Sequence, residues 1–167
     1  MSQVRPAASC DDPLRAPAPR ARAVRRDTHA MAEAPSPELL RDLMPFAKLI
    51  GIELLQAQPE LVRARLQWSP ERCTAAGVLH GGAMMALADT CGGVCAFLNL
   101  PEGALGTATI ESKTNFLRAV RDGAITASTR PLHAGRTLIV IESEIAREDG
   151  ALVAKVTQSQ AFHYPRA

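Results

Sequence analysis

The sequence predicts an α+β domain in which a curved antiparallel sheet wraps around one long central helix. The run from Ala83 to Leu98 is apolar on every face, which is typical of a helix buried on all sides. Most of the chain after this run has strand-like segments that are separated by short turn motifs. A single sheet curled around a single helix would bury the apolar surfaces of both.

The segment before the central helix predicts a short covering helix. Ser36-Pro37-Glu38 has the composition of a helix start, with a serine N-cap, a proline at the first helical position and an acid in the first turn. Leu39, Leu40 and Leu43 supply an apolar stripe. Pro45 is expected to end or kink this helix.

Strand patterns flank the central helix on both sides. Before it, residues 51–58 and 61–68 surround the turn signal Pro59-Glu60 and predict an antiparallel hairpin. A loop over residues 70–77 then leads into the helix. After the helix, three glycine-containing motifs predict hairpin turns in a four-stranded meander. The expected strands are 106–119, 123–133, 137–147 and 151–163.

Residues 1–35 form an Ala/Pro/Arg-rich tail that we expect to be disordered, and residues 36–165 form the folded domain. Residues 1–30 carry six Arg and three Asp, so the overall charge of +2 comes from the tail. The folded part gives no indication of a nucleic-acid surface. Met31 opens the first stretch with folded character. A translation start assigned too far upstream would account for the tail as well as a function of its own would.

Asp89 is the only charged residue in the apolar run. A carboxylate buried in such a helix is costly unless it is paired, hydrogen-bonded or hydrated, so it either holds the fold together or carries chemistry. Because Asp89 interrupts the longest apolar run, no membrane-spanning helix and no membrane partner are expected. The four cysteines form no C-x-x-C pair and are expected to be reduced core residues of a cytoplasmic protein: Cys10, Cys73, Cys91 and Cys95.

His80-Gly81-Gly82 marks an unusual helix start. Two residues without side chains leave backbone N–H groups open to a ligand, and such groups suit an anion or a developing oxyanion. Gly81 and Asp89 are eight residues apart, which is about 12 Å along a helix axis. If both serve one reaction, the donors of one chain should meet the carboxylate of a second chain.

These residues resemble the hotdog-fold acyl-CoA thioesterases, and among them the small phenylacetate-pathway type. The resemblance covers about Leu43 to Tyr164, which is most of the folded part. It rests on an ordered set of motifs: Gly77-Val78-Leu79-His80-Gly81-Gly82, Asp89 nine residues after the histidine, Asn115-Phe116-Leu117-Arg118, Gly135-Arg136 and Asp149-Gly150.

The resemblance implies hydrolysis of an acyl-CoA thioester at sites shared between the two subunits of a homodimer, and such dimers often pair into tetramers. Asp89 would be the nucleophile or general base, the Gly81 N–H would polarise the carbonyl beside His80, and Thr109 would position the water. No metal or redox cofactor is expected, because CoA is part of the substrate. The CoA end would meet residues near the helix start and on the later strands: Gly82, Lys113, Arg118, Arg121, Gly135 and Arg136.

Two positions depart from the family pattern and keep alternatives open. Thr74 stands where relatives commonly carry an Asn or Gln that helps to orient the carbonyl or the water, and it is expected to take this catalytic role as a shorter donor. Gly93 stands where some relatives carry Thr or Ser. These departures favour a non-catalytic acyl-CoA-binding module, whereas Asp89 favours an enzyme. A hydratase or dehydratase is a third reading. That chemistry uses an Asp with a His shortly downstream, and no His lies between Asp89 and His133.

Overall fold

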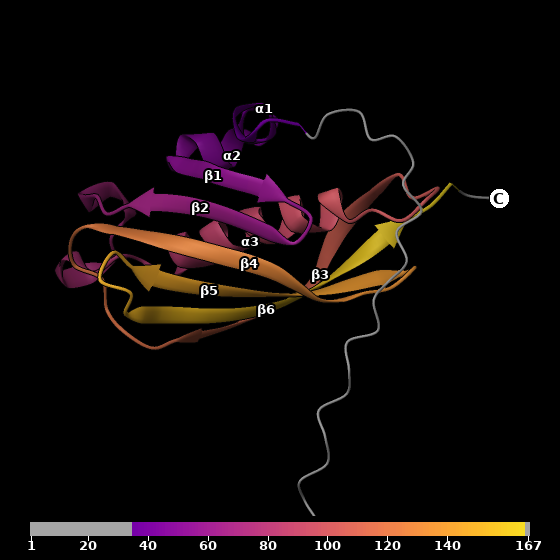
Figure 1. The fold of residues 1–167 in the computed structure, drawn as a ribbon. Helices are drawn as coiled ribbons and strands as arrows, with labels where there is room; N and C mark the ends of the chain where they lie inside the picture. Colours follow the sequence, from indigo (N-terminus) through magenta and orange to yellow (C-terminus); the bar gives the residue numbers. More distant parts are fainter. Residues whose placement is uncertain (1–34, 166–167) are drawn as a thin grey trace, which may run out of the picture. The chain divides into compact units, whose positions relative to one another are not determined.

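The computed structural model describes residues 35–165, which form one six-stranded antiparallel sheet with a long helix against one face (Figure 1). The α+β architecture expected from the sequence is therefore confirmed. The predicted tail, residues 1–35, lies outside the described residues except for Pro35.

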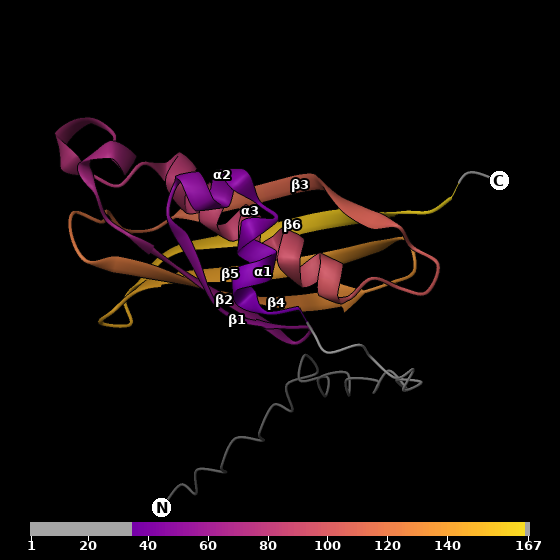
Figure 2. The ribbon, with the colours of Figure 1, turned by 90° about the horizontal axis from the view of Figure 1, so that it is seen from above.

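Two short helices precede the sheet, α1 (Pro37–Asp42) and α2 (Pro45–Leu49). The Ser36 hydroxyl accepts a hydrogen bond from the Leu39 N–H at 3.2 Å, which confirms the predicted N-cap. The predicted covering helix is broken at Pro45, as its sequence suggested, and both pieces lie on the same side of the sheet as the long helix (Figure 2).

The first two strands form the predicted hairpin, β1 (Ile52–Gln58) and β2 (Leu61–Gln67). The residues of β2 alternate between core and surface, in agreement with their sequence pattern. Two short 3-10 turns, Pro70–Arg72 and Ala75–Gly77, occupy the predicted loop before the long helix.

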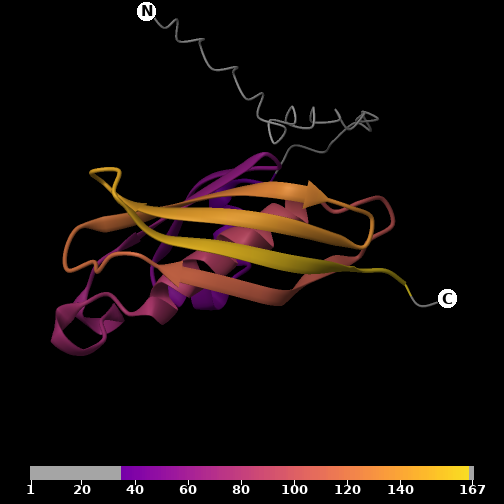
Figure 3. The same cartoon turned by 90° about the horizontal axis from the view of Figure 1, so that it is seen from below.

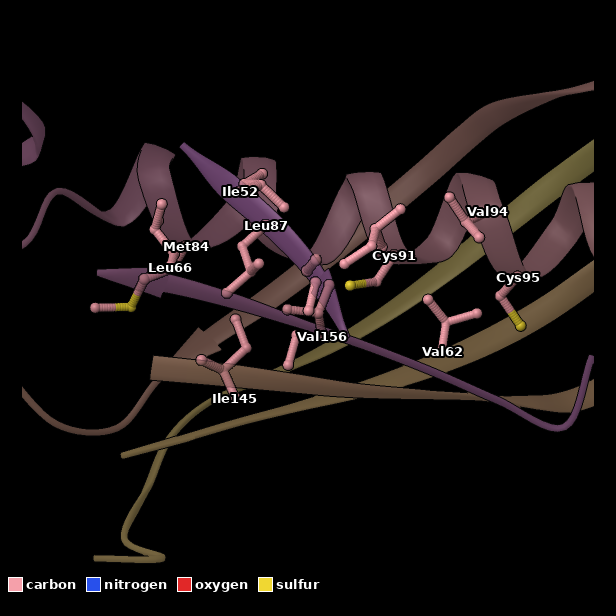
Figure 4. Close-up of a cluster of buried hydrophobic side chains, with 14 of the residues drawn as sticks. Ile52, Val62, Leu66, Met84, Leu87, Cys91, Val94, Cys95, Ile145 and Val156 are labelled. Carbon is pink, nitrogen blue, oxygen red and sulfur yellow. The ribbon is translucent and has the colours of Figure 1, made fainter. Parts of the chain in front are cut away.

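The long helix, α3 (Gly81–Leu98), packs one face on the inner surface of the sheet. Figure 4 shows Leu87, Cys91, Val94 and Cys95 pointing from α3 toward the strands, where they meet side chains such as Val62. At 18 residues and a mean hydropathy of 1.4, α3 is long and apolar enough to cross a membrane, contrary to the sequence expectation. Its place against the sheet accounts for the same composition.

The expectation that this helix is buried on all sides was wrong for a single copy of the chain. Met85, Asp89 and Phe97 lie on its exposed face, with Met85 41% and Phe97 48% exposed. The physical reason is that the sheet covers the helix from one side only. An apolar face therefore remains open beside Asp89.

The remaining strands follow in the predicted order, but they do not form a simple meander. Their bounds are β3 (Gly106–Phe116), β4 (Ala124–Ala134), β5 (Leu138–Arg147) and β6 (Leu152–His163). The spatial order of the sheet is β1-β2-β4-β5-β6-β3, so β3 pairs with β6 at the far edge (Figure 3).

The predicted hairpin turn at Arg121-Asp122-Gly123 was consequently wrong. The segment 117–123 is a crossover that carries the chain from the β3 edge to β4, which pairs with β2 instead. A hydrogen bond of 2.8 Å from the Leu79 N–H to the Val120 carbonyl ties this crossover to the entrance of α3. The glycine-containing turn motif describes only the local backbone, whereas the choice of pairing partner depends on how the sheet packs around α3.

Candidate active site

Asp89 accepts two side-chain hydrogen bonds, and both end on the same carboxylate oxygen. The Thr109 hydroxyl donates to Oδ1 at 3.0 Å, and the Gln158 amide Nε2 donates to Oδ1 at 2.8 Å. Within residues 35–165, Oδ2 has no hydrogen-bond or ion-pair partner. The carboxylate is therefore anchored through one oxygen and available through the other.

The two donors come from the paired strands β3 and β6. Thr109 was predicted from the sequence, and the structure brings it to Asp89 as expected. Gln158 was missed. The alternation of β6 carried the signal, because Gln158 occupies a core-facing position in register with Val156 and Phe162.

Asp89 lies beside a pocket of about 340 Å³ that α2, α3 and β3 enclose. Thr109 and Gln160 line this pocket with it. A second pocket of about 330 Å³ lies between α1 and the later half of α3, and its lining is almost entirely apolar. The two pockets have three lining residues in common, Met44, Gly93 and Thr107.

Gly93 lies where these two pockets meet. A Cβ built at this position would meet no atom within 4 Å. The chain therefore has open space at a residue that lines both the carboxylate pocket and the apolar pocket.

The start of α3 leaves one backbone donor open. The Gly82 N–H donates to His80 Nδ1 at 2.8 Å, so His80 is a side-chain N-cap. The next two N–H groups of the helix donate to the His80 carbonyl. Among the described residues, the Gly81 N–H has no partner, so the expected pair of donors is reduced to one.

The Gly81 donor lies in a pocket of about 410 Å³ that Thr74 and Arg118 also line. His80 and Gly82 line a different pocket of about 250 Å³, next to α2. The structure thus brings Thr74, Gly81 and Arg118 together and, separately, Asp89 and Thr109. The two sets occupy separate pockets of one chain, with Gly81 and Asp89 about 12 Å apart along α3.

The other residues predicted for the CoA end do not converge in one chain. Arg118 donates to the Leu152 carbonyl at 2.6 Å, at the start of β6. Gly135 and Arg136 lie in the β4–β5 turn near the other end of β6, where the Tyr164 hydroxyl donates to the Arg136 carbonyl. Arg121 donates to the Ala76 carbonyl at 2.9 Å, and Lys113 is exposed on β3.

The two cysteines of α3 lie in the core, as predicted, whereas Cys73 is only partly buried and Cys10 lies outside the described residues. Cys91 and Cys95 are fully buried and free, and burial raises the pKa of each thiol to about 12. A thiol in this environment stays protonated near neutral pH and is a poor nucleophile. Within residues 35–165, no group of three or more His, Cys, Asp or Glu side chains is arranged to hold a metal ion.

Comparison with known proteins gives one consistent family. Residues 76–154 match the family model described as the thioesterase superfamily. A protein of Haemophilus influenzae named "Putative esterase" is 33% identical over 112 residues, which are 66% of this chain and 80% of the relative.

Solved structures agree with this family. A mutant thioesterase of Pseudomonas aeruginosa has a TM-score of 0.74 and 26% identity, with 78% of this chain and 96% of that chain covered. A hypothetical thioesterase protein of Streptococcus pneumoniae, solved with coenzyme A, has a TM-score of 0.67 and 23% identity over 77% of this chain and 99% of that chain. At that identity the likeness concerns the fold alone.

Proposed function

The chain belongs to the thioesterase superfamily and has its hotdog fold, and from this premise we propose that it hydrolyses an acyl-CoA thioester to a free acid and CoA. One observation carries the proposal. Asp89 is held by two donors through Oδ1, while Oδ2 is available in a pocket that adjoins an apolar pocket. Membership of the phenylacetate-pathway type remains part of the proposal, because it rests on the motifs alone.

In the general-base form of the reaction, Asp89 Oδ2 takes a proton from a water molecule as the water oxygen bonds to the thioester carbon. The carbonyl oxygen becomes an oxyanion, which accepts a hydrogen bond from a Gly81 N–H at a helix N-terminus. When the carbon–sulfur bond breaks, Asp89 returns the proton to the departing thiolate. In the nucleophilic form, Oδ2 attacks the carbon directly, the carbon–sulfur bond breaks, and the CoA thiolate leaves and takes a proton from solvent. Water then hydrolyses the resulting mixed anhydride, which releases the acid and restores Asp89.

A homodimer would unite the two parts of the site. Gly81 and Asp89 are too far apart on one α3 to act on a single carbonyl, whereas two antiparallel copies of α3 would place Gly81 of one chain beside Asp89 of the other. Two features support this arrangement: the exposed apolar face of α3 and the exposed edge of β3 at the end of the sheet. Further pairing into tetramers is proposed from the family resemblance.

The apolar pocket beside Asp89 favours an apolar acyl group. Leu40 and Leu43 of α1 and Val94 and Phe97 of α3 line it. Such a lining offers no charged partner to the acyl group, so we expect an aromatic or medium-length to long aliphatic acid as the product. An acyl chain bound at Asp89 would enter this pocket across Gly93.

The CoA portion would extend from the Gly81 side of the site. Arg118 lines the Gly81 pocket, and Arg121 lies in the same crossover segment. Cationic side chains suit phosphates by charge and by donor geometry. The coenzyme A in the Streptococcus pneumoniae structure is a property of that protein, so the proposal for this chain rests on these arginines.

The test is thiol release from a panel of acyl-CoAs, measured for the wild type and for Asp89→Asn. The amide keeps the shape of the carboxylate but cannot take a proton, so kcat/KM should fall at least about 100-fold. Circular dichroism and the unfolding temperature should show that both proteins are folded.

If the wild type hydrolyses no thioester on the panel but still binds acyl-CoA, the enzyme proposal fails and the binding module takes its place. If Asp89→Asn retains wild-type kcat/KM, hydrolysis does not depend on Asp89. The acyl group with the highest kcat/KM would begin to identify the substrate.

A further inference from the structure

We propose that Gln158 is a positioning residue for Asp89 and that Gly92 exists in α3 to make room for it. This inference rests on the proposed thioesterase function. It adds a residue of the last strand to a site otherwise built from the helix and β3.

The Gln158 side chain is a buried donor. It is 1% exposed, and its amide Nε2 donates to Asp89 Oδ1 at 2.8 Å. Thr109 donates to the same oxygen but lies on β3, an edge strand with mostly exposed residues. A hydrogen bond from a buried amide to a carboxylate is charge-assisted and favours one orientation of the carboxylate. In that orientation Oδ2 remains available for the reaction.

The amide has only one productive orientation. Reversing it would place Gln158 Oε1 against the carboxylate oxygen. Both atoms are acceptors, so they could not form a hydrogen bond and would repel each other. In the observed orientation Oε1 is buried and has no partner within residues 35–165. A buried acceptor without a partner costs stability, and an apolar side chain at this core position would avoid that cost. The retained amide is therefore explained by its contact with Asp89.

Gly92 gives the second, independent observation. Glycine is unfavourable in the interior of a helix, and Gly92 lies in the middle of α3. A Cβ at this position would lie 2.0 Å from Gln158 Oε1 and 3.0 Å from its Cδ. Any side chain at residue 92 would therefore push the amide away from Asp89. The neighbouring Gly93 differs, because a Cβ there would meet no atom within 4 Å.

The first experiment is steady-state kinetics of Gln158→Met with the best acyl-CoA of the wild type. Methionine has a similar volume but no donor, so Asp89 should lose its fixed orientation while the pockets stay intact. We expect kcat to fall at least about 10-fold and KM to change less than about threefold. Gly92→Ala should lower kcat in the same direction, because its Cβ displaces the amide.

The control variants separate positioning from stability. Thr129→Val removes another buried hydrogen bond of the sheet, the 2.7 Å bond between the Thr129 and Ser143 hydroxyls, which lies outside the site. It should lower the unfolding temperature and leave kcat unchanged. Gly93→Ala is a reference for stability only, because Gly93 lines the proposed acyl path and its kinetics are expected to change. Its unfolding temperature shows what alanine contributes next to residue 92, and the unfolding temperature of Gly92→Ala is compared with it.

A crystal structure of Gln158→Met gives a readout that does not depend on activity. The Asp89 carboxylate should leave the wild-type orientation or occupy several. An unchanged orientation, or an unchanged kcat in an active enzyme, would overturn the positioning role. A wild type that hydrolyses no thioester would overturn the proposed function instead, and the orientation of Asp89 would still decide the role of Gln158.

Discussion

The ring of His80 determines which backbone donor is left at the start of α3. Its Nδ1 accepts the Gly82 N–H, and a Cβ on residue 82 would lie only 2.9 Å from that nitrogen. Gly82 thus serves the N-cap, whereas Gly81 keeps an N–H without a partner among the described residues. The absent Cβ of Gly81 also lets the Phe116 ring lie against the helix start, since a Cβ would be 2.9 Å from its Cζ.

The buried thiols of α3 predict a loss of stability at high pH. Burial raises the pKa of Cys91 from 9.0 to about 12, so between these values the unfolded chain loses a proton that the folded chain keeps. The free energy of unfolding should fall there by about 1.4 kcal/mol per pH unit for each such thiol, and this loss is absent below pH 9. Urea denaturation between pH 8 and about 10.5 measures the slope.

Cys91→Ala should reduce this slope, although it lowers the stability at neutral pH by leaving a cavity. Val94→Ala on the same buried face should lower the stability equally at every pH and keep the slope. Equal slopes for the wild type and Cys91→Ala would contradict the raised pKa.

At the scale of single residues, the sequence predicted the reacting groups of the site better than the residues that hold those groups in place. Asp89 stood out as a charge in an apolar run, and Gly81 stood out as a helix start without a side chain. The alternation of β6 marks Gln158 as a core-facing polar residue, but it does not show which residue the amide contacts. Its contact with Asp89 joins residues 69 positions apart, which no local pattern can predict.

The segment of α1 and α2 forms one wall of the apolar pocket beside α3. It places Leu40, Leu43 and Met44 opposite α3, so the space beyond Gly93 is enclosed by apolar side chains. The sequence predicted a covering helix here, but not that it would shape a pocket, since the shape of the pocket depends on where α1, which packs on β1, lies relative to α3.

Gly93→Leu should fill the space at the residue that lines both pockets. A Cβ at residue 93 meets no atom within 4 Å, so the variant should fold, and leucine should also stabilise the helix relative to glycine. The longer side chain would occupy the space proposed for the acyl chain. We expect kcat/KM for a medium-chain acyl-CoA to fall at least about tenfold, with a much smaller change for acetyl-CoA.

Gly93→Ala provides a graded comparison, with an effect between those of the wild type and leucine. An equal loss for acetyl-CoA and the medium-chain substrate would show that residue 93 does not lie in the path of the acyl chain. Unchanged kinetics with both substrates would place the acyl chain elsewhere.

The sequence located all six strands but misjudged how β3 connects to the sheet. Alternation and turn composition are properties of neighbouring residues, and they sufficed for β1, β2 and the β4–β5–β6 meander. The position of β3 beside β6 depends on closing the sheet around α3, which is a property of the whole domain. The position of β3 beside β6 also brings Thr109 next to Asp89. The site therefore depends on a strand order that the turn motif did not predict.

At the scale of the whole molecule, the proposed homodimer would explain both the separation of Gly81 from Asp89 and the exposed face of α3. A second copy would cover Met85 and Phe97 and would supply the donor that each Asp89 lacks in its own pocket. Ile110 on the edge strand β3 is 63% exposed and would be covered by the same contact. A dimer could bury this surface without bringing Gly81 of one chain to Asp89 of the other. A functional test is therefore needed to distinguish a shared site from a dimer that only covers the surface.

Mixing two inactive variants provides that test. Asp89→Asn removes the carboxylate, and Gly81→Val displaces the helix start, because its side chain would meet the Phe116 ring. If each site combines Gly81 of one chain with Asp89 of the other, a mixed dimer has one intact site and one doubly altered site. Refolding the two variants together in equal amounts should then restore about a quarter of the wild-type activity, since half of the dimers are mixed. Each variant refolded alone should stay inactive, and a mixture as inactive as its components would mean that each site lies within a single chain.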